Sequence, residues 1–243
     1  MSVILAALIL LAGLFIGATG IGGVLVVPAL TDAAGVAIDR AIAASMFGFL
    51  LTGIVAVALH RRSTEISVRD LSLLGLAALL GAAGGASVVE WLPAASIRLF
   101  IAVLAIVSGA HALVGRSAAR AQPRTLSGTA FGCIGFLVGC GSALSGTGGP
   151  VMLMPILLVL SVPVRTAIAM AQVIQLPIAL SATSVNAAYG RLDLPLAAVV
   201  GCLLVVGSVA GLRISRRIES HALKNGVAYG LIALGLWYAY SSL

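Results

Sequence analysis

Two stretches of the chain combine glycines with hydroxyl-bearing residues, and apolar residues flank each of them. The first runs from Gly17 to Gly23 and the second from Gly139 to Gly149. Glycine destabilises a helix by about 1 kcal/mol relative to alanine, so each cluster should interrupt a helix. A helix that restarts after such a break presents unpaired backbone N–H groups and the positive end of its dipole, which together bind anions. The residue types therefore predict an anion site between two helix breaks.

The residues expected to line this site come from both clusters and from the apolar segments that follow them. Gln172 and Gln175 are three residues apart and share one face of a helix. Two alternatives stay open: the glycines can serve close helix packing, and the amides can bridge helices. The candidate substrate-binding residues are Thr19, Gly20, Ile21, Gly22, Gly23, Ser45, Ser145, Gly146, Thr147, Gly148, Gly149, Gln172 and Gln175.

The composition is that of a polytopic membrane protein. Hydrophobic residues make up 61% of the chain and charged residues 9%, and the mean hydropathy is +1.19, whereas soluble domains are about one quarter charged. The net charge of +7 would suggest a nucleic-acid partner in a soluble protein. Here the arginines fall in short loops between apolar segments, as the positive-inside rule requires. We therefore expect a lipid bilayer and no nucleic acid as partner, and an N-terminal segment that is retained.

The sequence gives little indication of a metal site, a cofactor site or a catalytic site. Cys133, Cys140 and Cys202 show no metal-ligand spacing, and of these only Cys140, within the second cluster, is a candidate for a role at the site. A serine protease of the membrane would need a Gly-x-Ser-Gly motif and a histidine at depth, and Ser142 and Ser145 do not fit that pattern. We expect no metal, no cofactor and no enzyme activity.

The acidic residues also argue against a cation site. An intramembrane carboxylate usually marks a proton relay or an ion pathway, but here every acidic residue falls at the end of an apolar segment. Protons stay a candidate coupling ion without an evident carrier in the sequence. The acidic residues are Asp32, Asp39, Glu65, Asp70, Glu90, Asp193 and Glu219.

The chain divides into two similar halves, residues 1–120 and 121–243. The two glycine clusters lie about 126 residues apart, and Arg40 to Ala44 resembles Arg165 to Ala169. Such similarity at half the chain length is typical of transporter repeats. Segments long enough to span a membrane are predicted at 41–59, 71–89, 94–114, 166–188, 194–212 and 222–240.

The basic residues favour an inverted second half. If both broken elements cross the membrane, seven basic residues lie on each side, which gives no orientation signal. If both turn back, eleven lie on one side and three on the other, a strong positive-inside bias. We therefore predict an all-α fold of two inverted repeats, each with a re-entrant or discontinuous helix element and three spanning helices, and with both termini periplasmic. Insertion in two orientations stays an alternative. The three residues of the minority side are Arg40, Arg98 and Arg191.

The chain resembles the TauE/SafE family of sulfite exporters, also called the toluene-sulfonate uptake permease family. The resemblance is carried by Gly17 to Gly23 followed by Pro28, by Ser145 to Pro150 followed by Pro155, and by the duplicated layout. It implies a bacterial inner-membrane transporter of small sulfur-containing anions such as sulfite, thiosulfate, sulfonates or sulfoacetate. We expect export by alternating access, with an uptake permease or a passive anion channel as the alternatives. Thr147 interrupts the glycine pattern that the second repeat of this family often carries.

Overall fold

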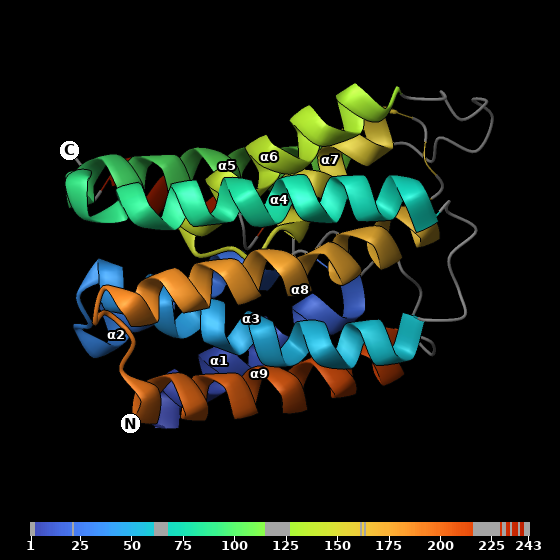
Figure 1. The fold of residues 1–243 in the computed structure, drawn as a ribbon. Helices are drawn as coiled ribbons and strands as arrows, with labels where there is room; N and C mark the ends of the chain where they lie inside the picture. The colour runs from blue at the N-terminus through green and yellow to red at the C-terminus, as the bar shows by residue number, and fades with distance from the viewer. Residues whose placement is uncertain are drawn as a thin grey trace.

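The computed structural model describes residues 3–20, 22–60, 68–114, 127–160, 162 and 164–215, with short pieces at 229, 232–233, 235–237 and 239–240. Across these residues helices are the only regular secondary structure, which confirms the all-α prediction. The elements (Figure 1) are α1 (Val3–Thr19), the 3-10 helix η1 (Gly22–Leu25), α2 (Val26–Ala34), α3 (Ile38–His60), α4 (Val68–Val88), the 3-10 helix η2 (Val89–Trp91), α5 (Ala94–Val114), α6 (Gly128–Ser145), α7 (Pro150–Val159), α8 (Val164–Ala188) and α9 (Leu194–Ser215).

Five of these helices are long and apolar enough to cross a membrane: α3, α4, α6, α8 and α9. Four of them were predicted as spans. The fifth, α6, was assigned to a broken element, but its 18 residues extend about 27 Å at 1.5 Å per residue, close to the ~30 Å of a hydrocarbon core. The predicted span at 94–114 forms α5, whose apolar part is shorter. The predicted span at 222–240 falls largely outside the described residues.

Both predicted helix breaks are present. The first helix, α1, ends at Thr19, and Gly20 has the positive φ of +78° that terminates it. A β-carbon at Gly22 would overlap the backbone of Ala12 and Ile16 in α1, so η1 turns back along the helix that precedes it. Ile21 lies outside the described residues.

The second break is longer. The helix α6 ends at Ser145, and Gly146, Gly148 and Gly149 all have positive φ, a region that glycine adopts without a steric penalty. The next helix, α7, begins at Pro150, and proline suits the first turn of a helix. Both clusters therefore reverse the chain.

Helices from the two halves of the chain pack against each other. The pairs with the most extensive packing are α4 with α6 and α1 with α9, and the central pair is α3 with α8. Two further pairs, α3 with α9 and α4 with α8, connect the centre to the sides. In Figure 1, α3 and α8 lie between α1 and α9 on one side and α4 and α6 on the other.

Glycines explain how α1 and α9 approach so closely. A β-carbon at Gly17 would overlap the carbonyl group of Ser208, and one at Gly211 would overlap that of Leu14. The packing of α4 on α6 repeats this arrangement, with Gly139 against Ala78. These are small-xxx-small contacts, the packing alternative that the sequence left open. The glycines of the two clusters therefore divide into packing residues inside the helices and break residues after them. Together with glycines outside the clusters, the packing set of these four helices is Gly13, Gly17, Gly81, Gly85, Gly135, Gly139, Gly207 and Gly211.

Candidate functional site

The two breaks meet beside α3, as the sequence predicts. A β-carbon at Gly23 in the first break would lie 2.5 Å from the carbonyl oxygen of Thr147 in the second. Ser45 of α3 donates a hydrogen bond from its Oγ to the carbonyl oxygen of Gly146 (3.1 Å). Residues that are more than 100 positions apart in the sequence thus form one buried junction.

The polar groups of the second break are enclosed by protein. The hydroxyls of Ser145 and Thr147 lie 2.9 Å apart and share a hydrogen bond, and Ser145 also bonds to the carbonyl of Gly141. Among the hydrogen bonds of the described residues, none is donated by the backbone N–H of Gly148 or Gly149, and both glycines are buried. These N–H groups at the start of α7 are the ones that the sequence predicts as anion donors, and neither glycine is part of the wall of the cavity described below.

The ring of Phe49 fills the space between the breaks. Its Cγ lies 2.7 Å from the position of a β-carbon at Gly148, and its Cζ lies 3.0 Å from that of a β-carbon at Gly23. The residue is 0% exposed. The place where two facing breaks could enclose an anion is therefore occupied by an aromatic side chain in this conformation.

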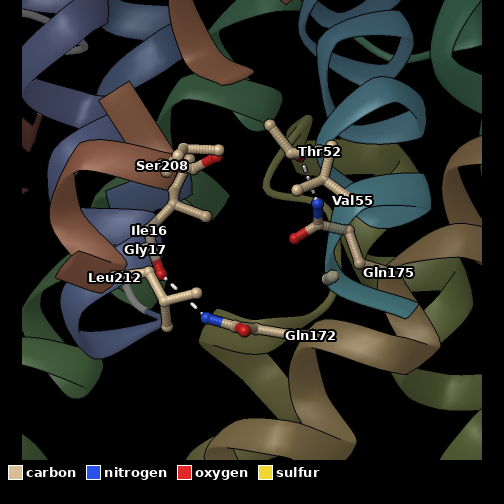
Figure 2. Close-up of a pocket in the computed structure, with 10 residues that line it drawn as sticks. Ile16, Gly17, Thr52, Val55, Gln172, Gln175, Ser208 and Leu212 are labelled. Atoms are coloured by element: carbon tan, nitrogen blue, oxygen red, sulfur yellow. Dashed lines mark hydrogen bonds between the residues drawn. The ribbon is translucent and has the colours of Figure 1, made fainter. Parts of the chain in front are cut away.

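A cavity lies where the C-terminal end of α1 approaches α3, α8 and α9 (Figure 2). Its volume is about 20 Å³, which is room for a single water molecule, so a larger oxyanion requires these helices to separate slightly. Its walls combine apolar and polar side chains: Ile16, Gly17, Thr52, Val55, Ala56, Gln172, Gln175, Ser208, Val209 and Leu212.

Both predicted glutamines line this cavity and also bridge helices. Gln172 donates from Nε2 to the carbonyl oxygen of Ile16 (3.0 Å), which ties α8 to the end of α1. Gln175 donates from Nε2 to the Oγ1 of Thr52 (2.6 Å) and to the carbonyl oxygen of Phe49 (3.0 Å), which ties α8 to α3. Figure 2 shows the amide oxygen of Gln175 directed toward the cavity. Because an amide group can exchange its oxygen and nitrogen by rotation, both side chains can present N–H donors to an anion.

Two polar residues of the cavity wall were missed by the sequence analysis. Thr52 and Ser208 place hydroxyl groups at the cavity from α3 and α9, where each donates to a backbone carbonyl of its own helix. Such hydroxyls can rotate toward a ligand. A single serine or threonine in an apolar helix is common in membrane proteins, so only the shared cavity distinguishes these two.

Most of the predicted break residues do not line the cavity. Thr19 bonds to the carbonyl of Phe15, Gly20 lies near Met154 of α7, and Gly22 packs on α1. The junction instead contains Ser45, Gly23 and the residues from Ser145 to Gly149. Only Gln172 and Gln175 of the candidate residues are in the cavity wall. Cys140 is half-buried in α6 and is not part of that wall.

A buried arginine lies elsewhere in the bundle, at the turn between α8 and α9. Arg191 is 5% exposed and donates to the carbonyl of Ala86 (2.8 Å), to Asn186 (3.3 Å) and to Glu90 (3.0 Å). Its guanidinium also lies 4.5 Å from the centre of the Tyr189 ring. The sequence analysis counted Arg191 only among the three basic residues of the minority side. The structure places Arg191 and Asn186 in a network that joins α8 and α9 to the end of α4.

The helical bundle, the two buried breaks and the cavity between helices define a multi-pass membrane protein of the transporter class. The family model described as "Sulfite exporter TauE/SafE" matches residues 5–238. The chain therefore belongs to the TauE/SafE family, as its resemblance predicted. No curated protein and no solved structure matches the chain.

Proposed function

We propose that the protein carries a small sulfur-containing oxyanion across the bacterial inner membrane and exports it by alternating access. The substrate class is that of sulfite, thiosulfate, a sulfonate or sulfoacetate. The observation that carries the proposal is the polar cavity beside the first break, which contains Gln172 and Gln175. Substrate contacts the cavity residues first and the buried N–H groups of the second break, at Gly148 and Gly149, in a later conformation.

The packing of the helices supports two inverted repeats, residues 1–120 and 121–243. Exchanging α1 with α6, α3 with α8 and α4 with α9 converts each major helix pair into another observed pair. The hairpins also point to opposite ends of the bundle, since α2 lies toward one end and α7 toward the other (Figure 1). Inverted repeats of this kind give alternating access in several transporter folds, because each half can adopt the conformation of the other.

In the proposed orientation of the two repeats, the cavity faces the cytoplasm. Its lining comes from the C-terminal parts of α3 and α9 and from the N-terminal part of α8. The sequence next to these ends is basic and includes Arg61, Arg62, Arg165, Arg216 and Arg217. Basic residues collect on the cytoplasmic side of a membrane, so the proposed orientation places both termini in the periplasm.

Flux measurements in proteoliposomes test this function. We expect saturable flux of labelled sulfite, thiosulfate or a sulfonate, and a dependence on an imposed proton gradient if protons are the coupling ion. The variant Gln175→Leu should lose most of this flux, whereas Ile134→Leu, an apolar exchange in α6, should retain it. Flux that is equal in both variants would place the site elsewhere. The absence of flux for every sulfur anion would reject the proposed substrate class.

A further inference from the structure

Phe49 is a side chain that contacts both helix breaks at once. Its ring lies against Gly23 in the first break and against Gly148 in the second, and it is fully buried. Both contacts depend on the missing side chains of glycine. The ring therefore closes the gap between the two halves of the chain at their junction.

The cavity begins one helical turn further along α3. Thr52 is part of the cavity wall and lies three residues after Phe49, about one turn of helix. Along α3, Phe49 thus lies between Thr52 at the cavity and Ser45, which bonds to Gly146 in the second break. A substrate that moves from the cavity to the second break has to pass this ring.

Gln175, a residue of the cavity wall, is hydrogen-bonded to the turn of α3 that contains Phe49 and Thr52. Gln175 donates to the carbonyl oxygen of Phe49 and to Thr52. If the amide rotates to donate to an anion in the cavity, the hydrogen bond to the carbonyl of Phe49 is lost, and the Thr52 hydroxyl can donate to the amide oxygen instead. Binding in the cavity would thereby loosen the turn of α3 that holds the ring in place.

Phe49 and Gln175 also occupy corresponding positions of the two halves. They are 126 residues apart, the same separation as that of Gly81 from Gly207 and of Gly85 from Gly211 in the glycine contacts. At the crossing of α3 and α8, one half thus provides a polar side chain and the other an aromatic ring.

We propose that Phe49 is the barrier of the transport pathway, and that a small oxyanion passes only when its ring leaves the gap between Gly23 and Gly148. This inference rests on the proposed function for its substrate. The barrier itself has a consequence that is independent of the substrate: a smaller side chain at this position should let small anions leak through the protein.

The test compares Phe49→Ala and Phe49→Leu with Phe47→Ala in proteoliposomes. Phe47 is a half-buried phenylalanine of the same helix, so its truncation controls for lost packing. The readouts are iodide entry, measured by quenching of a trapped fluorescent dye, and saturable flux of labelled sulfite. Phe49→Leu keeps most of the apolar volume and should fold even if Phe49→Ala does not.

We expect iodide entry to rise roughly tenfold or more in Phe49→Ala, which corresponds to a barrier lowered by about 1.4 kcal/mol. Phe49→Leu should give a smaller rise, and Phe47→Ala should match the unaltered protein. If iodide entry is unchanged in the folded Phe49 variants, the proposal that Phe49 is the barrier is overturned, whatever the sulfite flux is. A raised iodide leak in a protein that moves no sulfur anion would retain the barrier and reject the proposed substrate.

Discussion

At the first break, α1 ends beside a cavity that contains amide and hydroxyl groups. At the second, α6 ends against α3, and the hydroxyls of Ser145 and Thr147 bond to each other. The backbone differs as well, because Gly20 has positive φ in the first break and Gly146, Gly148 and Gly149 have it in the second. The first stretch thus lies with Gly17 beside a cavity, which we call the open site, whereas the second, which we call the filled break, is enclosed by protein.

The lengths of the preceding helices contribute to this difference. The helix α1 ends two residues after its packing glycine Gly17, whereas α6 ends six residues after Gly139. Four additional residues are about one turn of helix, so α6 continues about one turn further past its packing glycines. That turn contains Ser142 and Ser145, which are both fully buried. Similar clusters therefore have different surroundings, because α6 continues further past its packing glycines than α1 does.

The largest effect should follow from a negative charge in the open site. Gln175→Glu retains the size of the side chain but places a carboxylate in the cavity wall. At ~4 Å and an effective dielectric constant of ~20, the repulsion of a bound anion is about 4 kcal/mol, so binding should weaken roughly a thousandfold. Concentration dependence of sulfite flux measures this. Asn186→Asp makes the same change in α8 beside Arg191 and should leave the affinity unaltered, and equal losses in both variants would contradict the assignment of the cavity.

The packing glycines of α4 and α9 are equivalent in the two halves, so the same substitution should lower the free energy of unfolding by a similar amount in each. Gly85→Ala in α4 and Gly211→Ala in α9 each place a methyl group on a facing backbone, against Cys140 and Leu14 respectively. We expect each to lower the free energy of unfolding by about 1–3 kcal/mol, the usual cost of overpacking. Thermal unfolding in detergent measures the effect. The control is Gly84→Ala, because Gly84 is helical and no heavy atom lies within 4 Å of the position that its added methyl group would take; this variant should be neutral or stabilising.

The two breaks should respond differently to alanine. At Gly20 an added β-carbon meets only the Sδ of Met154 at 3.7 Å, so Gly20→Ala should cost about 1 kcal/mol from the left-handed backbone alone. At Gly148 the same strain is added to a clash with the ring of Phe49, and the loss of stability should be larger. Unfolding midpoints of the two variants provide the comparison. A larger loss for Gly20→Ala would show that the first break is the more tightly filled of the two.

The smallest effect is expected for a single hydrogen bond of the filled break. Ser45→Ala removes the bond to the carbonyl of Gly146 and should lower stability by about 1 kcal/mol. Since Ser45 is not part of the cavity wall, the concentration of sulfite that gives half-maximal flux should not change. A changed half-maximal concentration would indicate that substrate reaches the second break directly.

Much of this architecture follows from the sequence, because composition and glycine placement act locally. Glycine weakens a helix wherever it occurs in sufficient density, so both breaks were predictable. The roles of Gly17 and Gly139 were less evident, although each lies four residues after another glycine, the spacing of a packing contact. Gln172 and Gln175 stood out because amides are rare in apolar helices. They bridge helices, as one alternative predicted, and they line the cavity, while their contact with substrate stays a prediction.

The position of Phe49 could not be predicted from the sequence. The helix α3 is apolar on nearly all sides, and its hydrophobic residues therefore give no indication of which one faces the junction. Which side chain fills a gap depends on the helices that surround it. Thr52 and Ser208 became candidates for the same reason, since only the packing of α3 and α9 around the end of α1 brings their hydroxyls together.

The pairing of α1 with α9 also has a consequence for how the chain is made. The packing face of α1, with Gly13 and Gly17, is complementary to Gly207 and Gly211, which the ribosome adds about 190 residues later. During synthesis this face of α1 has no native partner and must be covered by lipid or by the insertion machinery. Likewise, the face of α4 that packs on α6 has no native partner until α6 has been synthesised. Because the major helix pairs join the two halves, we expect neither half to fold stably in the membrane without the other. Co-expression of the separate halves should therefore give a stable protein, whereas each half expressed alone should not.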